Sequence, residues 1–199
     1  MAHPRHPKLL VLDLDETLIH ARSRGEAELP WPPQRQVAHF RVYLRPGVQA
    51  FMNAVIERFA AVGVWTSASP DYAIAMLDRI VARNRLHFIF TRDRCTQRRD
   101  VDLDESYWIK DIRKLGGFGF DKQHILFVDD KARGLERSYA NLVSVPAFLG
   151  DPDDRMLGKL LAYLERLGPL DDVRSVDKRG WWRRMDELID VDLDGPDFS

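Results

Sequence analysis

Two aspartates separated by a single residue follow an apolar run near the start of the chain. The run covers residues 9–12, and Asp13 and Asp15 come after it. A short apolar run between polar residues is typical of a strand buried on both faces, as in the parallel sheet of an α/β fold. Ligands bind beyond the carboxyl ends of such strands. Asp13 therefore stands where a nucleophile is expected and Asp15 where its partner is expected, although these two residues alone also suit an acidic turn.

Polar residues of matching chemistry follow three more extended segments. They are Thr66 and Ser67 after 62–65, Lys110 after 106–109, and Asp129 and Asp130 after 125–128. Taken singly, each has an ordinary alternative: a helix start, a surface lysine, or a turn. Adjacent parallel strands bring their carboxyl ends to one edge of the sheet, so the set together predicts one site.

Carboxylates gathered at one sheet edge repel one another, because like charges in a partly buried site are costly. A hard divalent cation with oxygen ligands, Mg²⁺ above all, would offset that charge. Lys110 adds a further positive charge. Such a site suits an anionic substrate that bridges metal, lysine and a hydroxyl donor, and phosphate is the obvious candidate.

The elements that must position these residues alternate along the chain. Strands are expected at 37–44 (an edge strand), 61–65, 88–90, 106–109, 125–128 and 142–145, and helices at 48–59, from the cap at Ser69 to residue 80, and from near Pro152 to 164. Residues 21–36 are expected to form a loop or flap, and 92–105 a charged excursion. Strands that alternate with helices predict an α/β fold with a doubly wound, mostly parallel sheet.

Length and composition describe one ordinary globular domain. The chain has 199 residues, 45% hydrophobic and 31% charged, with a net charge of −1. We expect a single domain over 1–199, with a core at about 8–176 and a tail at 177–199. The charge gives no reason to expect direct binding to nucleic acid or membrane. The single Cys95 fits a reducing compartment, so we expect a cytoplasmic or other reducing intracellular location, and a monomer.

The ordered motifs resemble the haloacid-dehalogenase superfamily and, within it, the branch of RNA polymerase C-terminal-domain phosphatases, also called the NLI-interacting-factor-like family. The resemblance rests on Leu12-Asp13-Leu14-Asp15-Glu16-Thr17-Leu18, Leu44-Arg45-Pro46-Gly47-Val48, Trp65-Thr66-Ser67-Ala68 with Tyr72-Ala73 following, Ile109-Lys110-Asp111-Ile112-Arg113-Lys114-Leu115-Gly116 and Val128-Asp129-Asp130. Their order and spacing agree over about 8–176. The resemblance implies a Rossmann-like phosphatase core, and too few residues separate the motifs for a large cap domain.

The resemblance also implies a Mg²⁺-dependent phosphatase that works through an aspartyl-phosphate. Asp13 would be the nucleophile. Asp15 would protonate the leaving oxygen and then activate water. Asp13, Asp15 (through its backbone carbonyl) and Asp130 would bind Mg²⁺, with Asp129 close behind.

Other residues would hold the substrate. Thr66, with Ser67 beside it, would bind a phosphoryl oxygen, and Lys110 would hold the charge on the nucleophile and the phosphoryl group. Thr17 would brace the loop. The resemblance points to phosphoserine or phosphothreonine in a protein or peptide, which an uncapped site admits. Trp31, in the sequence Pro30-Trp31-Pro32-Pro33, would pack beside the phosphoresidue, unless this flap only covers the sheet.

Three other functions stay open on the sequence. A phosphatase for small molecules or nucleic-acid ends shares the fold, and so does a catalytically silent binding module, although both Asp13 and Asp15 are present. A receiver domain would need its acceptor aspartate after a middle strand, where this chain has Thr66.

Two segments depart from the family pattern. Lys131-Ala132-Arg133 stands where a Ser-Pro pair is usual, and the excursion between Arg92 and Ser106 is several residues longer than usual. Both departures bear on the substrate rather than on the catalytic groups. The tail carries Trp181 and Trp182, which we expect to fold back onto the core; contact with a partner is the alternative.

Overall fold

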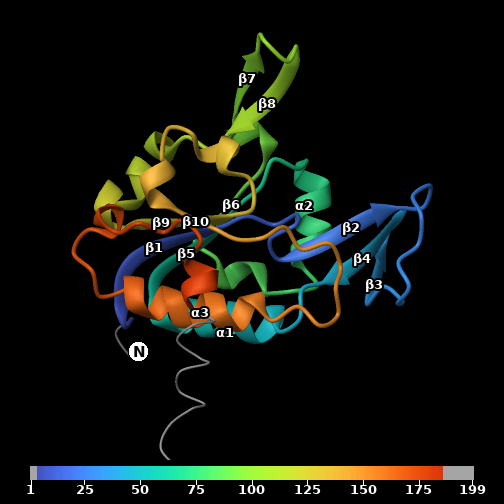
Figure 1. Cartoon of the computed structure of the whole chain (residues 1–199), viewed down its shortest axis with the longest axis horizontal. Coiled ribbons are helices and arrows are strands. Elements are labelled where there is room, and N and C mark those ends of the chain that lie inside the picture. Colours follow the sequence, from blue (N-terminus) through green and yellow to red (C-terminus); the bar gives the residue numbers. More distant parts are fainter. Residues whose placement is uncertain (1–3, 186–199) are drawn as a thin grey trace, which may run out of the picture.

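The centre of the molecule is a five-stranded parallel sheet in the order β10-β9-β1-β5-β6 (Figure 1). This computed structural model describes residues 4–185. The strands are β1 (His6–Leu12), β5 (Phe59–Trp65), β6 (Phe88–Phe90), β9 (Ile125–Asp129) and β10 (Leu142–Ser144). The predicted doubly wound, mostly parallel α/β sheet is therefore confirmed.

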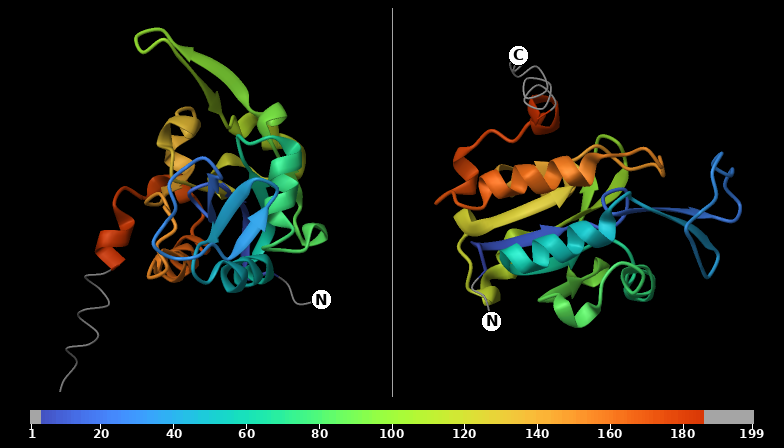
Figure 2. Two further views of the ribbon diagram at one scale, coloured as in Figure 1. Left: turned by 90° about the vertical axis from the view of Figure 1, so that its right-hand side faces the viewer. Right: turned by 90° about the horizontal axis from the view of Figure 1, so that it is seen from below.

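The inner strands β1, β5 and β9 are buried on both faces, which explains their apolar runs. In β1, Leu10 and Leu12 belong to one hydrophobic core, whereas Leu9 and Val11 belong to another on the opposite face. Helices α1 (Val48–Arg58), α2 (Pro70–Leu77) and α3 (Met156–Leu167) pack into the first core. Figure 2 shows α1 and α3 side by side across this face.

Short 3₁₀ segments, rather than long helices, cover the second face. They include η3 (Ile112–Phe118) and η5 (Ala132–Leu135), whose apolar residues pack against that core. Gly116 and Gly117 lie inside η3 and disfavour a longer helix there. This face is therefore covered by short 3₁₀ segments and loops instead of long helices.

The segment predicted as a flap, 21–36, is only partly a loop. A three-stranded antiparallel sheet in the order β2-β4-β3 projects there from the body of the molecule (Figure 1), formed by β2 (Ile19–Ser23), β4 (Phe40–Leu44) and β3 (Arg35–Val37). The single edge strand predicted at 37–44 is wrong, because the chain reverses at Ala38, which has φ 51°. The strands of this small sheet are short and mostly half-buried, so none of them carries a long apolar run. The insert is no large cap.

The charged excursion at 92–105 also contains regular structure. It forms most of an antiparallel hairpin of β7 (Thr96–Asp100) and β8 (Glu105–Ile109), the arm at the top of Figure 1. We call it the β7–β8 hairpin. Arginines in its first half and acidic residues around its turn are tolerated because most of its residues are exposed or half-buried.

The predicted starts of the second and third helices differ in accuracy. Ser69 is the N-cap residue of α2 and Pro70 its first residue, as predicted, although the serine hydroxyl makes no capping hydrogen bond. The helix expected near Pro152 begins at Met156 instead. There the side chain of Asp154 accepts a hydrogen bond from the Met156 amide (2.9 Å), which fixes the later start.

The described part of the tail folds back onto the core, as expected. Trp181 is fully buried and stacks on Tyr163 with ring centroids 4.6 Å apart. Its indole nitrogen donates to the carbonyl of Ser144 on the edge strand β10 (2.7 Å). Buried residues thus continue past position 176. The acidic pair Asp186 and Glu187 lies outside the described residues.

Within residues 4–185, no helix is both long enough and apolar enough to cross a membrane.

Candidate active site

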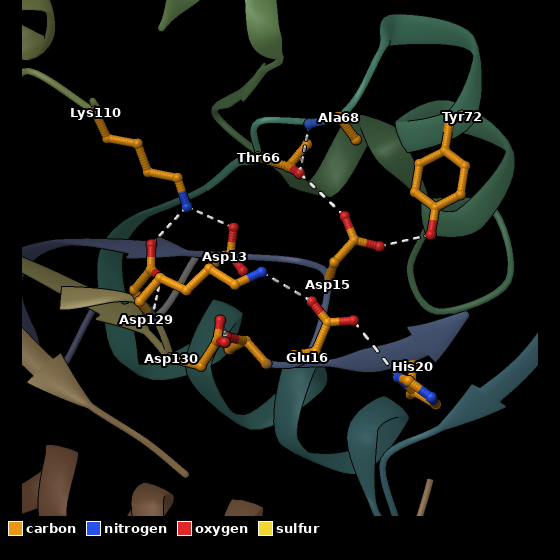
Figure 3. A network of polar contacts seen from close by, with 12 residues as sticks. Asp13, Asp15, Glu16, His20, Thr66, Ala68, Tyr72, Lys110, Asp129 and Asp130 are labelled. Atoms are coloured by element: carbon orange, nitrogen blue, oxygen red, sulfur yellow. Dashed lines mark hydrogen bonds and ion pairs between the residues drawn. The ribbon is translucent and has the colours of Figure 1, made fainter. Parts of the chain in front are cut away.

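Three neighbouring strands deliver polar residues to one edge of the central sheet (Figure 3). Asp13 follows β1, Thr66 follows β5, and Asp129 ends β9. Leu12 pairs with Val64 on one side and with Val128 on the other, so the three strand ends lie level. The parallel register therefore places these residues together, as the alternation of apolar runs and polar ends predicts.

Lys110 lies between two of the carboxylates. Its Nζ donates to Asp13 Oδ1 (2.5 Å) and to Asp129 Oδ2 (2.6 Å), and all three side chains are buried. Burial disfavours the charge on Lys110, but Asp129 and Asp13 outweigh it and raise the lysine's pKa. The lysine therefore stays protonated and balances part of the negative charge.

The remaining charge fits a divalent cation. Carboxylate oxygens of Asp13, Asp129 and Asp130 lie within 4.8 Å of one another. Burial raises the pKa of Asp13, against the opposing effect of Lys110, and burial raises the pKa of Asp130 to about 6. Hard oxygen ligands in such a cluster match the preference of Mg²⁺. Asp129, expected behind the metal site, thus belongs to the cluster itself.

The carboxylate of Asp15 points away from this cluster, toward two hydroxyl groups (Figure 3). Its Oδ2 accepts from Thr66 Oγ1 (3.3 Å) and its Oδ1 from the Tyr72 hydroxyl (2.5 Å). Burial raises the pKa of Asp15, and these two hydrogen bonds oppose the rise. A carboxyl group with a raised pKa suits proton donation to a leaving group. The predicted contact of its backbone carbonyl with a metal stays a prediction.

Tyr72 is a site residue without a predicted role. It lies in α2, and its ring packs edge-on against Phe40 of β4 with centroids 5.1 Å apart. The family motif includes this residue, but reasoning from strand ends assigns no role to a residue of the following helix. The sequence feature that could have identified it is its position six residues after Thr66, in the first turn of α2.

Arg45 is a second residue without a predicted role. The side chain is fully buried and donates to the carbonyls of Thr17 (3.0 Å) and Pro146 (3.1 Å). It also pairs with both carboxylate oxygens of Asp154 (2.9 and 3.0 Å). One guanidinium therefore ties the loop after β1 to the segment before α3.

The loop after β1 is held on several sides. Thr17 Oγ1 lies 3.4 Å from Asp130 Oδ1, a contact that suits the bracing role expected of this threonine. Glu16 adopts a left-handed conformation (φ 58°), which tightens the turn after Asp15. Its carboxylate pairs with Lys131 (3.1 Å), so the loop is also joined to the segment after the acidic pair.

Two hollows open at the site. A pocket of about 330 Å³ contains Asp13 and Lys110, and a groove of about 660 Å³ lies beside it. Asp15, Ser67 and Lys131 line both, so the two spaces are adjacent. The predicted phosphate-binding residues Thr66 and Ser67 therefore stand at the pocket wall.

Trp31 lies apart from both hollows. Its indole nitrogen donates to the carbonyl of Gly150 (2.5 Å), and the residue lines a separate pocket together with Pro30 and Tyr43. The structure gives no contact between Trp31 and the site, so its predicted role in substrate binding remains without support.

Known proteins resemble this chain over most of its length. A "Probable C-terminal domain small phosphatase" of Dictyostelium discoideum is 31% identical to this chain. The match covers 87% of this chain and 55% of the Dictyostelium protein. A "CTD nuclear envelope phosphatase 1 homolog" of Caenorhabditis elegans is 30% identical over 86% of the chain and 71% of its own length. The chain thus spans only about half of the Dictyostelium protein.

A solved structure shares the fold. The RNA polymerase II CTD phosphatase Fcp1 of fission yeast, bound to beryllium fluoride, superposes with a TM-score of 0.52 at 16% identity. The match covers 93% of this chain and 50% of that one. At this identity the likeness concerns the fold alone.

The relatives also correct one expectation. Several are named nuclear envelope phosphatases, including those of Caenorhabditis elegans and Xenopus tropicalis. Their names contradict the cytoplasmic location that we inferred from the single cysteine, because a reducing environment does not distinguish one intracellular site from another.

The predicted family is confirmed: the model of the NLI interacting factor-like phosphatases matches residues 8–174, and the chain belongs to that family.

Proposed function

We propose that this protein is a Mg²⁺-dependent phosphatase that forms an aspartyl-phosphate on Asp13 and acts on phosphoserine or phosphothreonine in extended peptide segments. The observation that carries the proposal is that the carboxylates of Asp13 and Asp15 have different hydrogen-bond partners. Asp13 lies against Lys110 and the acidic cluster, whereas Asp15, two residues later, is held by two hydroxyl groups. These different surroundings support attack by Asp13 and proton transfer by Asp15.

The proposed reaction has two steps. An oxygen of Asp13 attacks phosphorus, and the bond from phosphorus to the substrate oxygen breaks while Asp15 gives that oxygen a proton. Asp15, now a carboxylate, takes a proton from water as the water oxygen attacks the same phosphorus. The bond to Asp13 then breaks, which releases inorganic phosphate and restores both aspartates.

The surrounding residues supply charge. Asp13, Asp129 and Asp130 would hold Mg²⁺, which when bound neutralises charge on the phosphoryl oxygens. Lys110 contributes a fixed positive charge beside the nucleophile. Thr66 lines the pocket, and its hydroxyl, now paired with Asp15, would donate to a phosphoryl oxygen instead.

Two observations support a peptide substrate. The groove of about 660 Å³ beside the pocket is open and is lined by apolar groups such as Phe40 and Met76 as well as by Arg92 and Lys131. An extended chain could lie in it with the phosphoresidue at Asp13. The relative named a C-terminal domain small phosphatase points the same way, since its name refers to a protein segment.

The proposal is tested by comparing kcat/KM for phosphoserine peptides, phosphotyrosine peptides, nucleotides and sugar phosphates, with Mg²⁺ and with chelator. We expect turnover only with Mg²⁺ and a preference for phosphoserine or phosphothreonine peptides. Preference for nucleotides or sugar phosphates would contradict the substrate class. Full activity in chelator would contradict the metal dependence.

A further inference from the structure

Two segments that depart from the family pattern touch each other. One is the β7–β8 hairpin, and the other is the segment 131–133 after the acidic pair. Arg133 is the contact between them: its guanidinium pairs with Asp100 of β7 and lies over the ring of Tyr107 in β8, 3.9 Å from the ring centroid. Glu105 lies within 3.9 Å of the same guanidinium.

A second contact holds the same two segments together. The hydroxyl of Tyr107 donates to Glu136 Oε2 (2.9 Å), just after η5. The backbone adds a third, because the amide of Lys110 donates to the carbonyl of Gly134 (2.8 Å). The base of the hairpin is therefore held beside the acidic cluster by the backbone hydrogen bond. Arg133 contacts the hairpin further out, at Tyr107 in its middle and at Asp100 near its tip.

The position of the hairpin determines one wall of the active-site pocket. Tyr107, Trp108 and Arg133 line this pocket together with Asp13 and Lys110. Arg92 places its guanidinium over the ring of Trp108, 5.7 Å from the centroid. This wall thus consists of aromatic rings that contact guanidinium groups. The reacting phosphoryl group would lie beside it, next to Asp13 and Lys110.

We propose that Arg133 is a positioning residue that fixes the β7–β8 hairpin, so that Tyr107 and Trp108 form a subsite for the peptide residue next to the phosphoresidue. This inference rests on the proposed function. Aromatic faces offer contact to a neighbouring side chain and its backbone, and free phosphoserine has neither neighbour. The wall therefore favours extended substrates over small phosphates.

The first test compares a phosphoserine peptide with free phosphoserine, which contains the same reacting bond. In Arg133→Ala we expect kcat/KM for the peptide to fall about tenfold, through KM, because an ion pair and a cation–π contact are lost together. For free phosphoserine we expect a change of less than about twofold. Trp108→Ala should give the same pattern, and the double variant should be no worse than Trp108→Ala alone.

Arg137→Ala is the matched control. Arg137 and Arg133 have side chains of equal exposure, 40%, and each pairs with an aspartate, but Arg137 pairs with Asp111 and does not line the pocket. We expect it to leave the peptide's KM unchanged. Arg133→Lys, which keeps the charge but loses the planar stacking on Tyr107, should recover part of the loss.

A second readout does not depend on turnover. Amide hydrogen exchange in 96–109 should increase in Arg133→Ala and stay unchanged in Arg137→Ala. Unchanged exchange in Arg133→Ala would overturn the positioning role, and equal losses for peptide and free phosphoserine would overturn the subsite. If the wild type hydrolyses neither substrate, the proposed function fails, while the exchange experiment still decides whether Arg133 holds the hairpin.

Discussion

At the scale of single residues, the hydrogen-bond partners of the two aspartates differ more than their spacing suggests. The carboxylate of Asp13 accepts from an ammonium group, and that of Asp15 accepts from two hydroxyl groups. The sequence located Asp13, Asp15 and Thr66 because each follows a strand. It could not locate the role of Tyr72, because that depends on where α2 packs rather than on any strand end.

Tyr72→Phe tests this arrangement directly. The substitution keeps the ring that packs on Phe40 and removes only the hydroxyl that donates to Asp15. Because a hydrogen bond to a charged group contributes about 1.5–3 kcal/mol, we expect kcat to fall about tenfold or more. Steady-state kinetics would measure it. Unaltered kcat, with normal folding by circular dichroism, would show that Tyr72 does not orient the acid.

At the scale of elements, strands with long apolar runs were predictable from the sequence, whereas the pairing of the shorter, more exposed strands was not. The central strands β5 and β9 are buried on both faces, so their sequences alone identify them. The β7–β8 hairpin and the sheet β2-β4-β3 are less buried and carry more charged residues, so only 106–109 and 37–44 were predicted as strands and the rest as loop or charged excursion. Their pairing depends on chain reversals such as that at Ala38, which no apolar pattern signals.

Arg45 joins several elements, and its removal should destabilise the whole fold. Arg45→Ala leaves Asp154 and two carbonyl groups without their partner, so we expect the free energy of unfolding to fall by about 3 kcal/mol. Arg83→Ala removes an exposed pair with Asp78 and should cost less than about 1 kcal/mol. Urea denaturation of both variants measures the difference. Equal losses would mean that Arg45 does not brace the loop.

At the scale of the whole molecule, the fold concentrates acidic groups in one place although the net charge is only −1. Asp13, Asp129 and Asp130 gather at one sheet edge with Lys110 as the buried counter-charge. The topology β10-β9-β1-β5-β6 creates this cluster, since it places β1 between β9 and β5. The native state therefore carries an electrostatic cost at this edge, which a bound cation would remove.

Mg²⁺ should consequently stabilise the folded protein. At a concentration well above its dissociation constant, we expect the melting temperature to rise by about 5 °C, because the unfolded chain lacks the cluster. Asp130→Asn should abolish this rise, and should leave the metal-free protein no less stable, since one repelling charge is gone. Differential scanning calorimetry with Mg²⁺ and with chelator measures both effects. An equal rise in wild type and Asp130→Asn would place the cation elsewhere.

The central claim is that Asp13 carries the phosphoryl group during turnover, and Asp15→Asn allows it to be observed. An aryl phosphate has a leaving group that departs without a proton, whereas hydrolysis of the aspartyl-phosphate still needs the missing base. The variant should therefore release a burst of one equivalent of phenol and retain one phosphoryl group, which borohydride reduction and mass spectrometry should locate on Asp13. A phosphoryl group on another residue, or steady turnover without any phosphorylated protein, would contradict the account.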